Sequence, residues 1–230
     1  MSSSQIENSA INLFVVEGNI GSGKSTLMEE LKKHFKNNSN IVFLKEPVDD
    51  WEPITDENGI TILENFYKNP SKFGFSFQIM AFISRLNVLR EEFKKNPHAI
   101  FISERSLFTD KLVFAKMLFE SGNIELINYK IYLKWFDAFV CDFSINGVIY
   151  VNTEPEICHH RIVKRARTGE SNIPLEYLQN CHKYHINMLD TTSSECVCKN
   201  QIVLNGNTDI HENKEQLNLW IEQINEFIHK

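Results

Sequence analysis

The chain has 230 residues, a formal net charge of −6 and a hydrophobic fraction of 42%. These values are typical of one soluble globular domain, which we place at residues 11–230, and no stretch reaches the ~20 apolar residues needed to span a bilayer. The acidic balance argues against nucleic acid as the main partner. Residues 1–10 are polar and lack the features of a targeting signal, so we expect a disordered tail on a cytoplasmic protein. The five scattered cysteines indicate isolated reduced thiols.

A glycine-rich loop is the first distinctive feature in chain order. It follows an apolar, strand-like run at residues 11–16 and precedes apolar residues at helical spacing over 26–35. Glycines let backbone N–H groups turn toward phosphate oxygens, while a lysine can reach the terminal phosphates and a serine hydroxyl can ligate Mg²⁺. The alternative is an ordinary glycine turn that caps a helix. We predict a nucleoside triphosphate site made of Gly18, Asn19, Ile20, Gly21, Ser22, Gly23, Lys24, Ser25 and Thr26.

The rest of the chain alternates apolar runs with helical patterns. This alternation predicts an α/β fold with a five-stranded parallel sheet covered by helices on both faces. In such a sheet, ligands bind at the carboxyl ends of the strands. We predict the further strands at 41–44, 99–102, 148–151 and 202–204, and the further helices at 75–93, 107–120, 124–143 and 212–227.

Charged residues follow two of the predicted strands. Glu46 comes after residues 41–44 and is followed by a proline. A carboxylate beside a bound triphosphate suits a group that accepts a proton from an attacking hydroxyl, although a surface or capping glutamate is the alternative. Glu104 and Arg105 end the third strand, where Glu104 could hold Mg²⁺ directly or through water and Arg105 could stabilise the transferred phosphoryl group. A mutual ion pair between these two residues is the alternative.

A basic cluster lies near residue 165. Arg161 and Arg165 are four residues apart and share a helical face, Arg167 follows, and Gly169 releases the chain into a loop. Next to a triphosphate site, these arginines favour a lid at residues 161–172 that closes on phosphates. A solvated basic helix face is the alternative.

Together, these motifs resemble the deoxynucleoside kinase family, of the deoxycytidine/deoxyguanosine kinase type. The resemblance covers nearly the whole chain and implies a P-loop kinase fold with an arginine-bearing lid. The segments that carry it are the glycine-rich loop, Glu46-Pro-Val48 followed by Trp51, Phe75-Ser-Phe-Gln78, Glu104-Arg-Ser106, and the run from Arg161 through Arg165 and Arg167 to Glu170.

The resemblance also implies roles for individual residues. Glu46 corresponds to the general base that takes the proton of the deoxyribose 5′-hydroxyl. Tyr67 and Glu170 correspond to the pair that binds the 3′-hydroxyl, and Gln78 corresponds to the amide that reads the base edge. The lid arginines are expected to bind the donor phosphates. The aromatic walls of the base site would be Trp51, Phe77 and Phe114.

The preferred base depends on three further positions. Ala81, Arg85 and Asp110 stand where cytosine- and purine-preferring members of the family carry a small residue, Arg and Asp. We therefore favour deoxycytidine, deoxyadenosine or deoxyguanosine over thymidine. Residues 205–210 match the family's base-loop region poorly, which leaves donors other than ATP open.

We predict transfer of the γ-phosphoryl group of ATP, as its Mg²⁺ complex, to a deoxynucleoside 5′-hydroxyl. Lys24, Arg105 and the lid arginines would neutralise charge while Glu46 accepts the proton. A nucleoside monophosphate kinase and a non-catalytic accessory subunit of the same fold are the alternatives. The resemblance further implies a homodimer built on the long helices.

Overall fold

The computed structural model describes residues 11–140, 143–167, 169–170 and 173–230. The tail expected at residues 1–10 lies outside these ranges. A five-stranded sheet has the order β2-β3-β1-β4-β5, and every neighbouring pair is parallel. The predicted α/β fold is therefore confirmed, with each strand starting or ending within two residues of its expected limits. The strands are β1 (Asn12–Glu17), β2 (Ile41–Leu44), β3 (Ile100–Glu104), β4 (Gly147–Asn152) and β5 (Gln201–Asn205).

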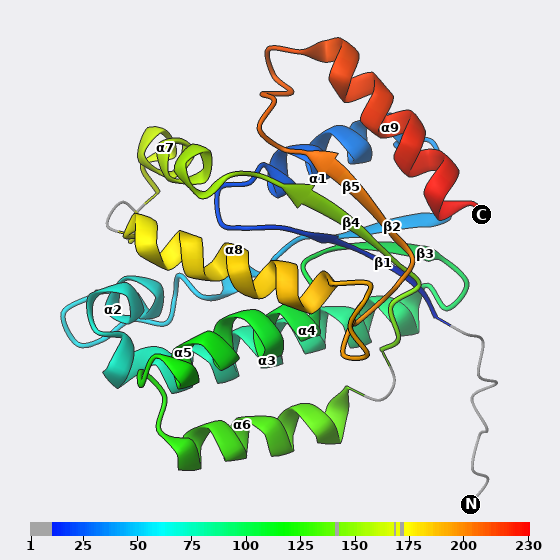
Figure 1. The fold of residues 1–230 in the computed structure, drawn as a ribbon. Coiled ribbons are helices and arrows are strands. Elements are labelled where there is room, and N and C mark those ends of the chain that lie inside the picture. Colours follow the sequence, from blue (N-terminus) through cyan, green and yellow to red (C-terminus); the bar gives the residue numbers. More distant parts are fainter. Residues whose placement is uncertain (1–10, 141–142, 168, 171–172) are drawn as a thin grey trace, which may run out of the picture.

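Helices cover both faces of the sheet because its central strands are apolar on both sides. In β1, Leu13 and Val15 belong to one buried core, and Phe14 and Val16 belong to the other, as the alternation of side chains along a strand requires. Figure 1 shows the two layers of helices. One layer is α1 (Lys24–His34) with α9 (Lys214–Ile228); the other includes α3 (Pro70–Lys95), α4 (Leu107–Thr109), α5 (Lys116–Glu120), α6 (Leu126–Phe139) and α8 (Leu175–Leu189).

The connection from β1 to α1 is the glycine-rich loop, which we call the phosphate loop (residues 18–25). At two positions the loop backbone passes so close to a neighbouring carbonyl group that only glycine fits. A Cβ on Gly21 would lie 2.6 Å from the Cys158 carbonyl oxygen, and one on Gly18 would lie 2.6 Å from the Val151 carbonyl oxygen, with φ at +76° and +147°. No side chain fits there without moving the backbone. The loop backbone therefore lies close against β4 and α7 (Pro155–Arg165).

The edge at which the strands end carries shorter elements. The 3₁₀ turn η1 (Val48–Asp50) follows β2, and α2 (Ile62–Lys68) precedes α3. Thr61 caps α2 by accepting from the Glu64 N–H, and Asn69 caps α3 by accepting from the Lys72 N–H ahead of Pro70. The two helices enclose a third apolar cluster that includes Trp51 and Phe77.

The structure differs from the sequence prediction in four helical regions. The helix predicted at 107–120 is α4, a π-helical segment η2 (Asp110–Ala115) and α5 in succession. The helix predicted at 124–143 is shorter, because α6 ends at Phe139 and residues 141–142 lie outside the described ranges. The helices α2 and α8 were not predicted. The seven residues of α2 are too few for a clear period, and polar side chains conceal the apolar spacing of α8.

Two further expectations concern the whole chain. Within the described ranges, no helix combines the length and the apolar character needed to cross a membrane. Cys158, Cys181, Cys196 and Cys198 are free, as predicted for reduced thiols. Cys141 lies outside the described residues.

Candidate active site

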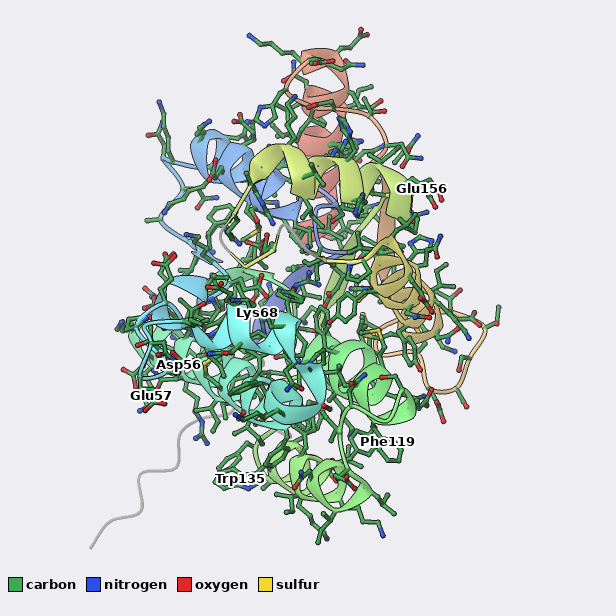
Figure 2. All side chains as sticks on the ribbon, turned by 90° about the vertical axis from the view of Figure 1, so that its left-hand side faces the viewer. Asp56, Glu57, Lys68, Phe119, Trp135 and Glu156 are labelled. Carbon is green, nitrogen blue, oxygen red and sulfur yellow. The ribbon has the colours of Figure 1, made fainter. Side chains whose placement is uncertain are left out.

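The carboxyl ends of the strands surround a cavity of about 350 Å³, which we call the central cavity. Figure 2 views the molecule from this edge, with α7, which carries Glu156, on one side and α2, which carries Lys68, on the other. Residues of both helices line the cavity, and so do residues of the phosphate loop, α3 and η2. Every predicted site residue lines it except Gly18 and Asn19.

Lys24 is buried at the start of α1 and is held within the phosphate loop. Its Nζ donates to the Asn19 carbonyl oxygen at 2.7 Å. The Asn19 side chain holds the loop in turn, because its Nδ2 donates to the Leu178 carbonyl oxygen at 2.8 Å and its Oδ1 accepts from the Ile20 N–H. Asn19 therefore shapes the loop rather than facing the cavity. Burial, followed by the charge of Arg105, lowers the pKa of Lys24 to about 8.

Ser25, in the first turn of α1, and Glu104, at the end of β3, bring two side-chain oxygen atoms together. The Ser25 Oγ donates to Glu104 Oε1 at 2.6 Å, and both residues line the central cavity. A hydroxyl and a carboxylate are hard oxygen donors of the kind that Mg²⁺ prefers. This donor set fits the predicted Mg²⁺ site.

Glu46 lies at the end of β2 and contacts two guanidinium groups. Its Oε1 is 2.9 Å from Arg85 Nη2 and 3.3 Å from Arg105 Nε. Burial alone would raise the pKa of the Glu46 carboxyl, but Arg105, Arg85 and Lys24 together lower it to about 2. Glu46 is therefore a carboxylate at neutral pH and forms the anionic centre of a cationic cluster.

Arg105 has a left-handed backbone, with φ at +64°, directly after β3. This conformation is unusual for a residue with a side chain and is concentrated at functional sites. Among the described residues, Arg105 does not pair with Glu104, so the alternative of a mutual ion pair is wrong. Arg105 pairs with Glu46, while Glu104 accepts from Ser25.

Arg85 connects Glu46 to the buried Asp110. Arg85 Nε donates to Asp110 Oδ2 at 2.9 Å, and Nη1 donates to the Glu104 carbonyl oxygen at 2.8 Å. Burial raises the pKa of Asp110, and Arg85 opposes that shift. The Arg and Asp that the family resemblance singled out at these positions thus form a fully buried pair. The π-helical segment η2 carries both Asp110 and Phe114 to the cavity wall.

Aromatic rings line the part of the cavity next to α2 and α3. Trp51 meets Phe77 edge-on at 5.4 Å between ring centroids, and Phe77 stacks on Phe66 at 4.6 Å. Gln78 is buried, and its Oε1 has no hydrogen-bond partner among the described residues. An unpaired amide oxygen in a buried wall is costly unless a ligand supplies a donor. This wall therefore suits a flat ligand with a hydrogen-bonding edge.

The lid predicted at 161–172 begins in the last turns of α7, and Ala166, which follows the helix as its C-cap, has a left-handed conformation. Arg165 and Arg167 both pair with Glu170, and the second of these contacts is 3.3 Å. Residues 168, 171 and 172 of the lid lie outside the described ranges. Arg161 donates from Nη1 to the carbonyl oxygens of Ser22 and Gly206 at 3.2 and 2.9 Å. Arg161 thus ties the phosphate loop to the segment after β5.

Sequence reasoning missed several residues of the cavity wall. Phe66 and Leu63 belong to α2, which was not predicted, and Tyr177 belongs to α8. Lys164 adds a further cation from α7. The segment after β5, which matched the family pattern poorly, also contributes Gly206, Thr208, Asp209, Ile210 and His211. For α8, the spacing of Leu178, Cys181, His185 and Met188 was the available signal.

Comparison with known proteins agrees with this geometry. A family model described as deoxynucleoside kinase matches residues 14–229. A Fowlpox virus protein named "Probable deoxycytidine kinase" is 33% identical over 93% of this chain and 86% of its own length. Human deoxycytidine kinase is 31% identical over 98% of this chain and 94% of its own.

Relatives of other named specificity also match. Human mitochondrial thymidine kinase 2 is 31% identical over 76% of this chain and 63% of its own length. The resemblance stated from the motifs is therefore confirmed, together with the P-loop kinase fold. The chain belongs to the deoxynucleoside kinase family and is an enzyme of the nucleoside kinase class.

Proposed function

We propose that this enzyme transfers the γ-phosphoryl group of ATP to the 5′-hydroxyl of a deoxynucleoside. The observation that carries the proposal is that one cavity is lined by both the phosphate loop and the Gln78 amide with its aromatic neighbours. A triphosphate and a nucleoside base would then occupy the same cavity. Glu46 and Arg105 line that space as well, next to the phosphate loop in the cationic cluster described above.

The cationic cluster accounts for the chemistry. Glu46 is ionised and accepts the proton of the 5′-hydroxyl, and Arg105 and Lys24 neutralise charge on the transferred group. In the free protein these cations lower the pKa of Glu46. A bound triphosphate adds negative charge beside them, which offsets their effect and makes Glu46 a stronger base in the complex than in the free protein.

The triphosphate would be bound together with the predicted Mg²⁺. Ser25 and Glu104 would hold it, and the ion would supply charge neutralisation on the phosphates. Arg165 and Arg167 exchange Glu170 for donor phosphates when the lid closes. Glu170 is then released to bind the sugar 3′-hydroxyl together with Tyr67.

Base preference follows from the cavity wall to which Gln78 belongs. Ala81 is small, and the Arg85–Asp110 pair provides a fixed polar group in the same cavity as the Gln78 amide. This combination supports deoxycytidine, deoxyadenosine or deoxyguanosine as the acceptor over thymidine. It leaves room for either ring size because Ala81 adds only a methyl group to the wall.

The proposed homodimer uses the outer helices. Ile83 on α3 and Ile127, Ile131 and Trp135 on α6 are between 42 and 69% exposed, and Trp135 lies on the outermost helix in Figure 2. An apolar face of this kind is typical of a subunit interface. The double variant Ile131→Glu, Trp135→Glu should be monomeric by sedimentation. A wild-type monomer at micromolar concentration would contradict the dimer.

We also propose a cytoplasmic location, supported by the free described cysteines.

The test of the reaction is ADP release from ATP-Mg²⁺ with each of the four deoxynucleosides and, separately, with their monophosphates. We expect turnover that depends on a deoxynucleoside and is slow with every monophosphate. Preferential turnover of a monophosphate would favour the monophosphate kinase instead. Absence of turnover with all eight compounds would favour the non-catalytic alternative.

A further inference from the structure

A fully buried histidine from α8 lies against the guanidinium of Arg105. His185 Nε2 is 3.4 Å from Arg105 Nη1, and His185 Nδ1 is 2.7 Å from the Cys181 carbonyl oxygen. Arginine can only donate, so Nη1 donates to Nε2, and Nε2 must carry a lone pair. The ring proton is therefore on Nδ1, which donates to the Cys181 carbonyl. The two contacts together define one tautomer.

The remaining contacts of Arg105 show what this hydrogen bond controls. Nη1 also donates to the Gly18 carbonyl oxygen at 2.8 Å, so both of its N–H groups are used. Nε faces Glu46, and the guanidinium carbon lies 5.1 Å from the centroid of the Phe114 ring. Nη2 has no acceptor within the part of the chain that the structure describes. Its two N–H groups are therefore available to a ligand in the central cavity.

His185 is suited to hold this group because it is neutral. Burial, followed by the charge of Arg105, lowers its pKa well below the ordinary value. The ring also packs edge-on against Phe114, with 6.4 Å between the centroids. A neutral acceptor orients the guanidinium without competing with Glu46 or a phosphate for its charge, as a carboxylate at this position would.

We propose that His185 is a positioning residue for phosphoryl transfer. Its Nε2 fixes the rotation of the Arg105 guanidinium that directs Nε to Glu46 and leaves Nη2 for the transferred group. The inference rests on the proposed function, in which Arg105 stabilises that group. It assigns His185 no contact with the substrate.

Two substitutions at position 185 distinguish the hydrogen bond with Arg105 from the hydrogen bond with the Cys181 carbonyl. His185→Gln places an amide oxygen as far along the side chain as Nε2 and can accept from Arg105. His185→Asn reaches only as far as Nδ1 and can retain the contact with Cys181 alone. His182, in the same helix, has a buried Nδ1 with no partner among the described residues. His182→Gln and His182→Asn are therefore matched controls.

The measurements are kcat and KM for ATP and the deoxynucleoside, with thermal unfolding to show that each variant is folded. We expect His185→Asn to lower kcat by about 10- to 100-fold, as loss of a hydrogen bond to a charged group implies. His185→Gln should recover most of this loss, and KM should change little in either variant. In an Arg105→Lys background, the difference between Gln and Asn at position 185 should disappear.

Equal kcat for the Gln and Asn variants would overturn the inference, and so would a difference that persists with Lys at position 105. Controls at position 182 with the same loss would also overturn it, because the effect would then belong to the helix. Wild-type turnover is measured in the same experiment. Its absence would reject the proposed function instead, so the two failures are distinguishable.

Discussion

The Arg105 Nε lies 3.3 Å from the Glu46 Oε1, which joins the ends of β3 and β2 across the candidate active site. The two residues come from strands that are direct neighbours in the sheet. Their contact places a carboxylate and a cation side by side next to the phosphate loop.

Glu46→Gln removes the proton acceptor and keeps the shape of the side chain. We expect kcat to fall by about 10²- to 10⁴-fold, the contribution typical of a general base, while ATP binding changes little. The measurement is steady-state ADP release together with ATP titration by calorimetry. Glu92→Gln is the control, since Glu92 pairs with Lys95 at the surface far from the cavity. Retention of most activity in Glu46→Gln would remove Glu46 from this role.

ATP affinity should depend on pH through Lys24, whose pKa is about 8 in the free protein. A bound triphosphate raises this pKa, so binding above pH 8 requires uptake of a proton. Affinity is then constant below pH 8 and weakens by up to about tenfold per pH unit above it. Calorimetry between pH 7 and 9.5, in buffers of different ionisation enthalpy, measures both the ATP affinity and the proton uptake.

Deoxyadenosine and deoxycytidine provide the control for this pH dependence, because neither titrates between pH 7 and 9.5. Their binding in the absence of ATP should be independent of pH over this range. Constant ATP affinity from pH 7 to 9.5, without proton uptake, would contradict the assignment of Lys24.

Asp110→Asn should destabilise the fold as well as the site. It removes the negative charge that pairs with Arg85 Nε in the buried site, and breaking a buried ion pair lowers the free energy of unfolding by about 3–5 kcal/mol. The measurement is urea denaturation. Asp137→Asn is the control, because Asp137 pairs with Lys111 at the surface and its loss should change stability by less than about 1 kcal/mol. Equal effects of the two substitutions would contradict the structural role of Asp110.

The double variant Arg165→Ala, Arg167→Ala tests the lid. We expect a fall in kcat on the order of 10²-fold and a higher KM for ATP, because two cations are lost from the donor phosphates. Binding of a deoxynucleoside alone should persist, since Glu170 is then no longer paired with arginines. Lys183→Ala, on the exposed side of α8, is the control. Unchanged kinetics in the double variant would restore the interpretation of a solvated basic face.

Residues close together in sequence made the phosphate loop and the strands predictable. Gly18 to Ser25 form one contiguous motif, and the uninterrupted apolar runs directly predict buried strands. Glu46, Glu104 and Arg105 could be placed together because parallel strands end at one edge of the sheet. The buried Arg85–Asp110 pair, 25 residues apart, was reached only through the family resemblance.

Residues that depend on tertiary packing were not predictable in the same way. The π-helical turn that carries Asp110 and Phe114 to one wall has no local sequence signal. His185 looks like a polar residue of a polar helix until α8 is packed against η2 and Arg105. Arg161 was assigned to phosphates, but its contacts with backbone carbonyls depend on the loop after β5, which sequence alone did not place.

Identification of the product tests the central claim most directly. The protein is incubated with ATP-Mg²⁺ and one deoxynucleoside, and the products are followed by ³¹P NMR with chromatography against 3′- and 5′-monophosphate standards. The account predicts a deoxynucleoside 5′-monophosphate that forms in equal amount with ADP. ADP that forms without any phosphorylated deoxynucleoside, or phosphorylation at the 3′-oxygen, would contradict it.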